Sequence, residues 1–157
     1  IQLANNHGVK TAVDPKKDNF LLYKNVTLFK PNLKELKEGL GIDFSLTKEP
    51  DRFKDAVLSL EKELNNKISF ITLSEHGVYI KKDNESYHLP AHLRNIADVS
   101  GAGDTVISVA TLCLVCDVPI DLLAEISNIA GGLVCEISGV VSIDFDHLLE
   151  ETQRLIG

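Results

Sequence analysis

The 157-residue chain has no methionine and no tryptophan, and it has three cysteines, so no set of disulfides can use them all. We expect Cys113, Cys116 and Cys135 to be buried free thiols of a cytoplasmic protein. Cys113 and Cys116 have the spacing of a redox or zinc site. However, they lie in an apolar helical pattern, and the sequence has no second cysteine pair that could complete a zinc site. The five histidines show no metal-ligand spacing either.

Positive charge is also scarce, because 16 Lys and Arg face 23 Asp and Glu, for a net charge of −7. This balance argues against nucleic acid or an anionic membrane as the main partner. No apolar run is long enough to span a bilayer, and no signal-peptide pattern opens the chain. With 44% hydrophobic residues, the sequence predicts one soluble, globular domain that buries a substantial core.

Apolar periodicity predicts strands that alternate with helices. Residues 1–8 have the pattern of the last turns of a helix that ends at a glycine. We expect strands at 9–14 (buried), 26–30, 68–73, 78–82 and 86–89, and helices from 32 to 39 or 41 and at 51–64, 102–116, 120–136 and 144–155. This order indicates a three-layer α/β sheet with a small antiparallel portion near 77–90.

The most informative segment is Asp-Val-Ser-Gly-Ala-Gly-Asp-Thr at 98–105, which leads directly into an apolar stretch. Small residues let the backbone approach a ligand closely, and the first N–H groups of the following helix attract an anion, most often a phosphate. Asp104 would repel a phosphate unless it has another purpose, such as taking a proton from an attacking hydroxyl. The alternative is an ordinary glycine-rich turn with Asp104 in the first helical turn.

This segment resembles the C-terminal signature of the ribokinase-like (PfkB) carbohydrate kinases. Further resemblances follow in the family's order at 14–16 (Asp-Pro-Lys), 31–35 (Pro-Asn-Leu-Lys-Glu), 72–77 (Thr-Leu-Ser-Glu-His-Gly) and 128–132 (Asn-Ile-Ala-Gly-Gly). The branch that it matches best is that of the D-glycero-β-D-manno-heptose-7-phosphate kinases. The resemblance covers nearly all of the chain, and it is much more specific for the family than for the substrate.

The resemblance implies transfer of the γ-phosphoryl group of ATP to a sugar hydroxyl. Asp104 would be the general base, and the backbone of Gly101, Ala102 and Gly103 would form an anion hole for the transferred group. The implied substrate is D-glycero-β-D-manno-heptose 7-phosphate, converted to the 1,7-bisphosphate in lipopolysaccharide precursor synthesis. Another PfkB-type sugar or nucleoside kinase, or a non-catalytic nucleotide-binding fragment, stays open as an alternative.

Asn32 and Glu35 match the family's Asn-x-x-Glu motif, which helps to place the Mg²⁺ of the nucleotide through water. The same spacing predicts a capping box at a helix N-terminus, and the two interpretations are compatible. Lys16 could meet a phosphate at the carboxyl edge of the sheet, or it could be a solvated lysine.

The family holds the nucleotide base and ribose near the positions that correspond to Ser74, Gly77 and Asn128. Many members have glycine where this chain has Ser74. Gly77 could equally be a turn residue, and Asn128 an ordinary amide on a helix surface. Each of the three is therefore predicted as a nucleotide contact with a structural alternative.

Asp98 and Ser100 are the predicted residues of a metal site. We expect Asp98 to end a strand just before the phosphate loop. The resemblance implies that this Asp, with the carbonyl after it, lies beside a monovalent cation such as K⁺. Carbonyls near Cys135, Ser138 and Gly139 would complete its shell. The alternative for Asp98 is a turn-forming residue.

The family's domain is longer than this chain. We expect residues 1–157 to be the C-terminal, nucleotide-binding part of a single ribokinase-like kinase domain, with little activity alone. A homodimer of the complete enzyme is a further option that the sequence leaves open.

Overall fold

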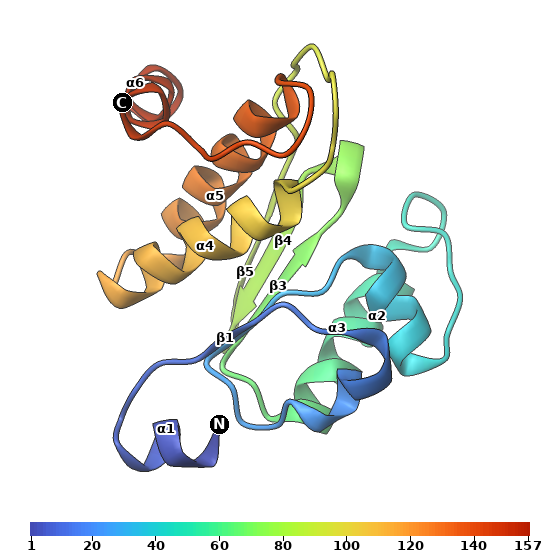
Figure 1. Cartoon of the computed structure of the whole chain (residues 1–157). Coiled ribbons are helices and arrows are strands. Elements are labelled where there is room, and N and C mark those ends of the chain that lie inside the picture. The colour runs from blue at the N-terminus through green and yellow to red at the C-terminus, as the bar shows by residue number, and fades with distance from the viewer. The chain divides into compact units, whose positions relative to one another are not determined.

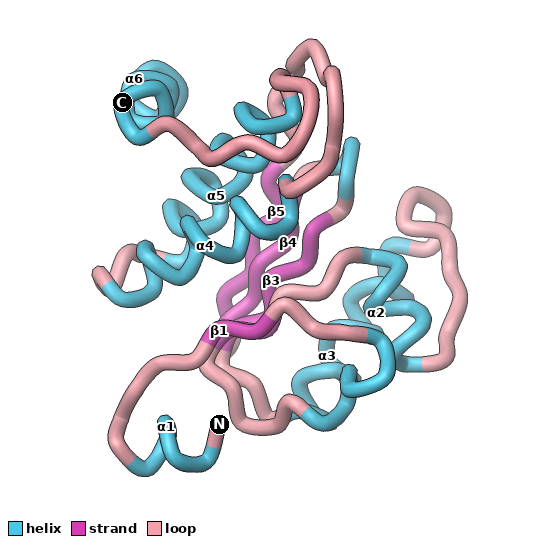
Figure 2. Tube along the Cα trace, in the orientation of Figure 1, coloured by secondary structure: helices cyan, strands magenta, loops and turns pink.

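A computed structural model describes all 157 residues, and they form two compact units (Figure 1). The first unit comprises 1–73 and 79–86, and the second comprises 74–78 and 87–157. The sheet has the strand order β1-β2-β3-β4-β5, with bounds Ala12–Val13, Leu28–Phe29, Ile68–Thr72, Val78–Lys82 and Glu85–Leu89 (Figure 2). β1 pairs with β2 and β2 with β3, both in parallel. A turn at Asp83 and Asn84 joins β4 to β5.

The helices lie where their start and stop signals predict. They are α1 Gln2–Asn6, α2 Leu33–Leu40, α3 Pro50–Leu64, α4 Ala102–Val115, α5 Ile120–Cys135 and α6 Phe145–Ile156, with short 3₁₀ helices at η1 Lys17–Leu22 and η2 Ser74–His76. Asn32 caps α2, Asp144 caps α6, and Gly41 ends α2 in the left-handed conformation. None of these helices has the length and apolar character needed to cross a bilayer.

The core of the first unit forms around α3. Its apolar residues recur every three or four positions, and all of those on one face are buried: Phe53, Ala56, Val57, Leu60 and Leu64. The ring of Phe53 meets that of Tyr79 edge to face, with centroids 5.0 Å apart. Phe20 and Phe29 form a second edge-to-face pair at 5.2 Å. Such pairs add specific geometry to the burial of apolar area.

The first strand is shorter and less buried than its sequence predicts. The expected strand at 9–14 is reduced to Ala12–Val13, whose residues are half-buried, while Val9 is 57% exposed. The backbone N–H of Thr11 donates to the hydroxyl of Thr27, and the N–H of Thr27 donates to the hydroxyl of Thr11. These side-chain bonds add to the backbone bonds from the Leu28 N–H to the Thr11 carbonyl and from the Lys30 N–H to the Val13 carbonyl. In the sheet order β1 neighbours β2 alone.

In the second unit, α4 and α5 pack side by side along their lengths (Figure 1). A Cβ at Gly131 would lie 2.6 Å from Cγ2 of Val106, so a larger residue would push the two helices apart. Glycine at 131 therefore sets their close approach.

The three cysteines are free, as expected, but they are not all buried. Cys113 and Cys135 are buried, and burial raises the pKa of both thiols. Cys116 is exposed, contrary to the prediction, because it lies at the C-cap of α4, beyond the last helical residue.

Candidate functional site

The N-terminus of α4 is built around a left-handed glycine. Gly101 is the N-cap with φ of +80°, and a Cβ there would lie 3.0 Å from Cγ1 of Val140. No side chain caps this helix, and the Ala102 N–H donates to the Val99 carbonyl at 3.3 Å. Because the first N–H groups of a helix have no partner within it, those of Gly103 and Asp104 are suited to an anion.

Asp104 is exposed and is the third residue of α4, beside these N–H groups. Its backbone carbonyl accepts the Ser108 hydroxyl at 2.7 Å, while the next side chain, Thr105, is buried. The backbone at Asp104 is thus held by contacts within the helix and by the buried side chain that follows, while the Asp104 carboxylate is exposed to solvent. The geometry suits a base beside a bound anion, and it equally suits a carboxylate that the helix dipole stabilises.

Asp98 organises the loop before α4. One carboxylate oxygen accepts the Ser100 N–H at 2.9 Å and the other accepts the Gly139 N–H at 3.0 Å. These donors, Ser100 foremost, lower the pKa of Asp98, so it is ionised at neutral pH. The turn-forming role is therefore observed, while the cation role of Asp98 and Ser100 stays a prediction.

The expectation that Asp98 ends a strand is wrong. β5 ends at Leu89, and the N–H groups of Ala97 and Asp98 both donate to the Cys135 carbonyl, at 2.8 and 3.1 Å. The loop therefore bonds to the end of α5 instead of to a strand. Both lone pairs of the Cys135 carbonyl are used, which argues against this carbonyl as a cation ligand.

The predicted base and ribose contacts have structural roles in the second unit. Ser74 and Gly77 lie in and after η2 with φ of +54° and +83°. A Cβ on Gly77 would overlap the Leu89 carbonyl oxygen, so packing alone requires glycine there. The Asn128 amide donates to the Pro90 carbonyl at 2.9 Å. Contacts from these three residues to a nucleotide stay a prediction.

In the first unit, Asn32 and Glu35 form the predicted capping box. The Asn32 side chain accepts the Glu35 N–H, and Glu35 Oε2 accepts the Asn32 N–H, both at 2.8 Å. Asn32 also bridges to Thr72 at the carboxyl ends of β2 and β3. The cap uses one carboxylate oxygen of Glu35, and the other oxygen suits a hydrated Mg²⁺. No group of three or more His, Cys, Asp and Glu side chains is arranged to hold a metal ion directly.

The same carboxyl edge carries an ion pair that sequence reasoning missed. Lys30 Nζ lies 2.9 Å from Asp14 Oδ1, and the Lys30 side chain is only 3% exposed. Val13 faces Phe29 in the β1–β2 register, so the residues that follow them are neighbours. This alignment depends on the register between two strands, which the sequence does not display. Lys16, the predicted phosphate contact, is exposed two residues further on.

Comparison with known proteins identifies the family. The family model described as pfkB family carbohydrate kinase matches residues 1–146. The chain belongs to this family. It is 34% identical over 150 residues to the bifunctional protein HldE of Sulfurimonas denitrificans, covering 96% of the chain and 31% of that protein. It is 36% identical over 151 residues to HldE of Shewanella piezotolerans, and this match covers 96% of the chain and 31% of that protein. The PfkB chain thus spans about a third of the length of these relatives.

Solved structures confirm the predicted ribokinase-like, three-layer α/β fold. Phosphofructokinase-2 from Escherichia coli, in complex with potassium, aligns with a TM-score of 0.87 at 20% identity, over 98% of this chain and 50% of that one. Arabidopsis thaliana ribokinase, complexed with ribose and ATP, aligns with a TM-score of 0.82 at 19% identity. This alignment covers 95% of the present chain and 49% of the ribokinase chain. At such identities the likeness establishes the fold.

Proposed function

We propose that this PfkB chain provides the nucleotide-binding part and the general base of an ATP-dependent sugar kinase. The observation that carries the proposal is the start of α4, where a left-handed Gly101 opens an uncapped helix and Asp104 stands exposed in its first turn. This arrangement offers N–H donors to a phosphoryl group and a carboxylate to the hydroxyl that attacks it.

In the proposed reaction, the sugar oxygen forms a bond to the γ-phosphorus of ATP while the bond from that phosphorus to the bridging oxygen of ADP breaks. Asp104 accepts the proton that the sugar hydroxyl loses. The backbone of Gly101, Ala102 and Gly103 is proposed to stabilise the charge on the transferred group, which is the main protein contribution in such transfers. The Ala102 N–H would exchange its long 3.3 Å bond to the Val99 carbonyl for a bond to that group.

Asn32 and Glu35 are proposed to hold the Mg²⁺ of the nucleotide through water, and Lys16 to meet a phosphate. The metal would neutralise phosphate oxygens. Ser74, Gly77 and Asn128 are proposed contacts to the nucleotide. The monovalent cation proposed beside Asp98 and Ser100 has support in one structural neighbour, which is a potassium complex.

The proposed acceptor is D-glycero-β-D-manno-heptose 7-phosphate, phosphorylated at its anomeric hydroxyl. It rests on the resemblance of residues 96–107 to the heptose-kinase branch and on the similarity to HldE proteins. A different sugar or nucleoside acceptor is the second candidate, because the fold neighbours include a ribokinase with bound ribose.

The test is Asp104→Asn in the complete protein, assayed with heptose 7-phosphate and a panel of sugars and nucleosides. The amide has nearly the same shape but cannot take the proton, so we expect kcat to fall about 10²- to 10⁴-fold while ATP binding is kept. Near-normal kcat would refute the base assignment. ATP binding without turnover of any acceptor in the wild type would favour a non-catalytic nucleotide-binding protein.

A further inference from the structure

The segment between β5 and α4, residues 90–101, is attached along α5 at several points. The Pro90 carbonyl accepts from Asn128, and His92 Nε2 forms a 2.8 Å hydrogen bond with Glu125. Further on, the Ala97 and Asp98 N–H groups reach the end of the same helix. Because this segment leads directly into the Gly101 turn, its attachment decides where that turn lies.

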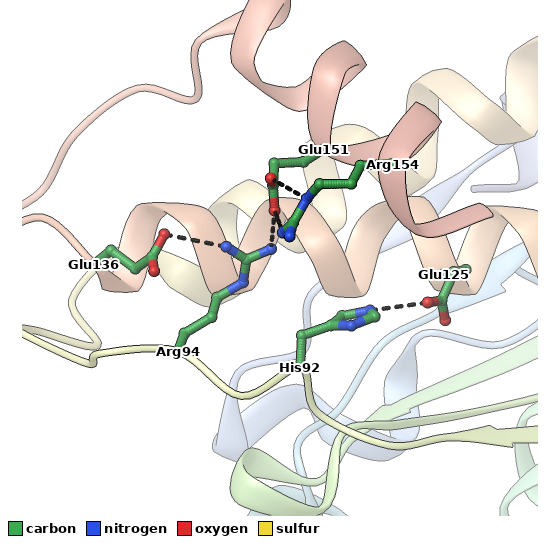
Figure 3. Close-up of polar contacts among 6 residues, drawn as sticks. All are labelled: His92, Arg94, Glu125, Glu136, Glu151 and Arg154. Carbon is green, nitrogen blue, oxygen red and sulfur yellow. Dashed lines mark hydrogen bonds and ion pairs between the residues drawn. The ribbon is translucent and has the colours of Figure 1, made fainter. Parts of the chain in front are cut away.

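Arg94 makes the most extensive of these attachments (Figure 3). Its side chain is 7% exposed, and its guanidinium pairs with Glu136 at 3.1 Å and with Glu151 at 2.9 Å. Glu136 is the C-cap residue of α5, and Glu151 belongs to α6. One buried side chain thus ties the loop to two helices that lie 42 and 57 residues further along the chain.

The Arg94 side chain crosses α5 at Gly132, where the absence of a side chain leaves room for it. A Cβ at Gly132 would lie 2.8 Å from Nε and 2.9 Å from Cδ of Arg94. The backbone of α5 at Gly132 therefore lies directly against the Arg94 side chain. The contact indicates that the position of Arg94 is fixed by packing as well as by its ion pairs.

Glu151 is held as an anion on both sides. Arg154 donates to both of its oxygens, at 2.9 and 2.7 Å, and Arg94 approaches one of them. Arg154 first and then Arg94 lower the pKa of Glu151 to about 2. The partner of Arg94 therefore keeps its charge throughout the neutral range.

We propose that Arg94 is a positioning residue for the anion-binding turn at 101–104. It touches neither the turn nor Asp104, and it acts by fixing the loop that carries Asp98, whose carboxylate in turn holds Ser100 and Gly139. The catalytic consequence rests on the proposed kinase function, but the structural consequence does not.

The first experiment measures amide hydrogen exchange in Arg94→Ala and Arg94→Lys. We expect the Ala97 and Asp98 amides, which bond to Cys135, to exchange at least about tenfold faster in Arg94→Ala. Arg94→Lys, which keeps one charge but cannot bridge two carboxylates, should be intermediate. Arg154→Ala is the matched control, because Arg154 also pairs with Glu151 but is 66% exposed and lies on α6.

The second experiment compares the kinetics of the same variants in the complete protein. We expect Arg94→Ala to lower kcat about 10- to 100-fold with partial recovery on adding methylguanidinium, and Arg154→Ala to leave kcat unchanged. If Arg94→Ala does not fold, amide exchange and kcat of Arg94→Lys test the proposal instead. Wild-type protein without turnover refutes the kinase proposal, while exchange still tests the positioning role. Equal exchange and equal kcat in the Arg94 and Arg154 variants would overturn the inference.

Discussion

The N-termini of α2 and α4 differ in how their backbone N–H groups are capped. A sequence without glycine leads into α2, and a glycine-rich sequence leads into α4. At α2, the side chains of Asn32 and Glu35 satisfy backbone N–H groups within the helix itself. At α4, the N-cap is Gly101, and no side chain caps the helix. The first end is capped by its own side chains, whereas the second has no side-chain cap.

The difference extends to the surroundings of each helix end. Beside α2, the buried Lys30 is paired with Asp14, so the polar groups of that edge are matched internally. Beside α4, the side chains that pair, such as Arg94 and Asp98, hold the loop in place and leave the turn itself uncovered. The capped end of α2 gains stability from its own side chains, and the uncapped end of α4 has backbone N–H groups that suit an anion.

The largest effect should come from Gly101→Val, which alters the uncapped end of α4. A β-branched residue does not adopt φ of +80°, and its Cβ would crowd Val140. We expect the turn to rearrange, the backbone donors to be lost, and kcat of the proposed kinase to fall by about 10²- to 10³-fold or more. Steady-state kinetics with saturating ATP would measure this loss.

Gly41→Val is the matched control for that variant. Gly41 has φ of +64° at the end of α2, and a Cβ there meets no atom within 4 Å. It should cost stability of about 1–3 kcal/mol through backbone strain, yet leave kcat unchanged. Similar kcat values for the two variants would argue against a special role for the turn at α4.

The next effect is on stability, from Lys30→Met beside the capped end of α2. The change leaves Asp14, whose side chain is 26% exposed, without its buried partner. Removing one partner of a fully buried pair costs about 3–5 kcal/mol, and partial exposure of Asp14 should reduce this to about 2 kcal/mol. Urea unfolding measures the loss. Lys34→Met, which removes an 83% exposed lysine 3.8 Å from Glu38, should change the free energy of unfolding little.

The two helix ends also differ in how far sequence predicts them. The capping box could be predicted because its residues are three apart and their bonds are local. The loop from 90 to 101 could not, because its partners lie far along the chain, at Asn128, Cys135 and Glu151. The missed ion pair of Asp14 and Lys30 likewise depends on the register between two strands. Local signals therefore predicted elements and the glycine turn, while long-range contacts decided how the turn is supported.

A smaller loss of stability is expected when the side-chain cap of α2 is removed. Asn32→Ala removes the acceptor of the Glu35 N–H, and loss of such a cap costs about 1 kcal/mol. Asn32→Asp keeps an acceptor and should retain most of the stability. Thermal unfolding of the three proteins would measure the difference. A wild-type-like melting temperature for Asn32→Ala would show that water replaces the cap without cost.

The smallest effect concerns pH and the support of the uncapped end of α4, and it compares Glu151→Gln with the wild type. Because the pKa of Glu151 is lowered from 4.5 to about 2 in the folded chain, its ionised form adds stability above pH 4.5. That contribution falls as the pH drops from about 4.5 towards 2, where the folded-state carboxylate also takes up a proton. The glutamine variant lacks this contribution, so the gap between the two free energies of unfolding should be constant from pH 7 to about 5.5 and then narrow. Urea unfolding at a series of pH values measures the gap, with Glu150→Gln, an exposed neighbour on α6, as the control. A gap that keeps its full size at pH 3 would mean that Glu151 acts through shape and hydrogen bonding, and that its charge does not support the loop through Arg94.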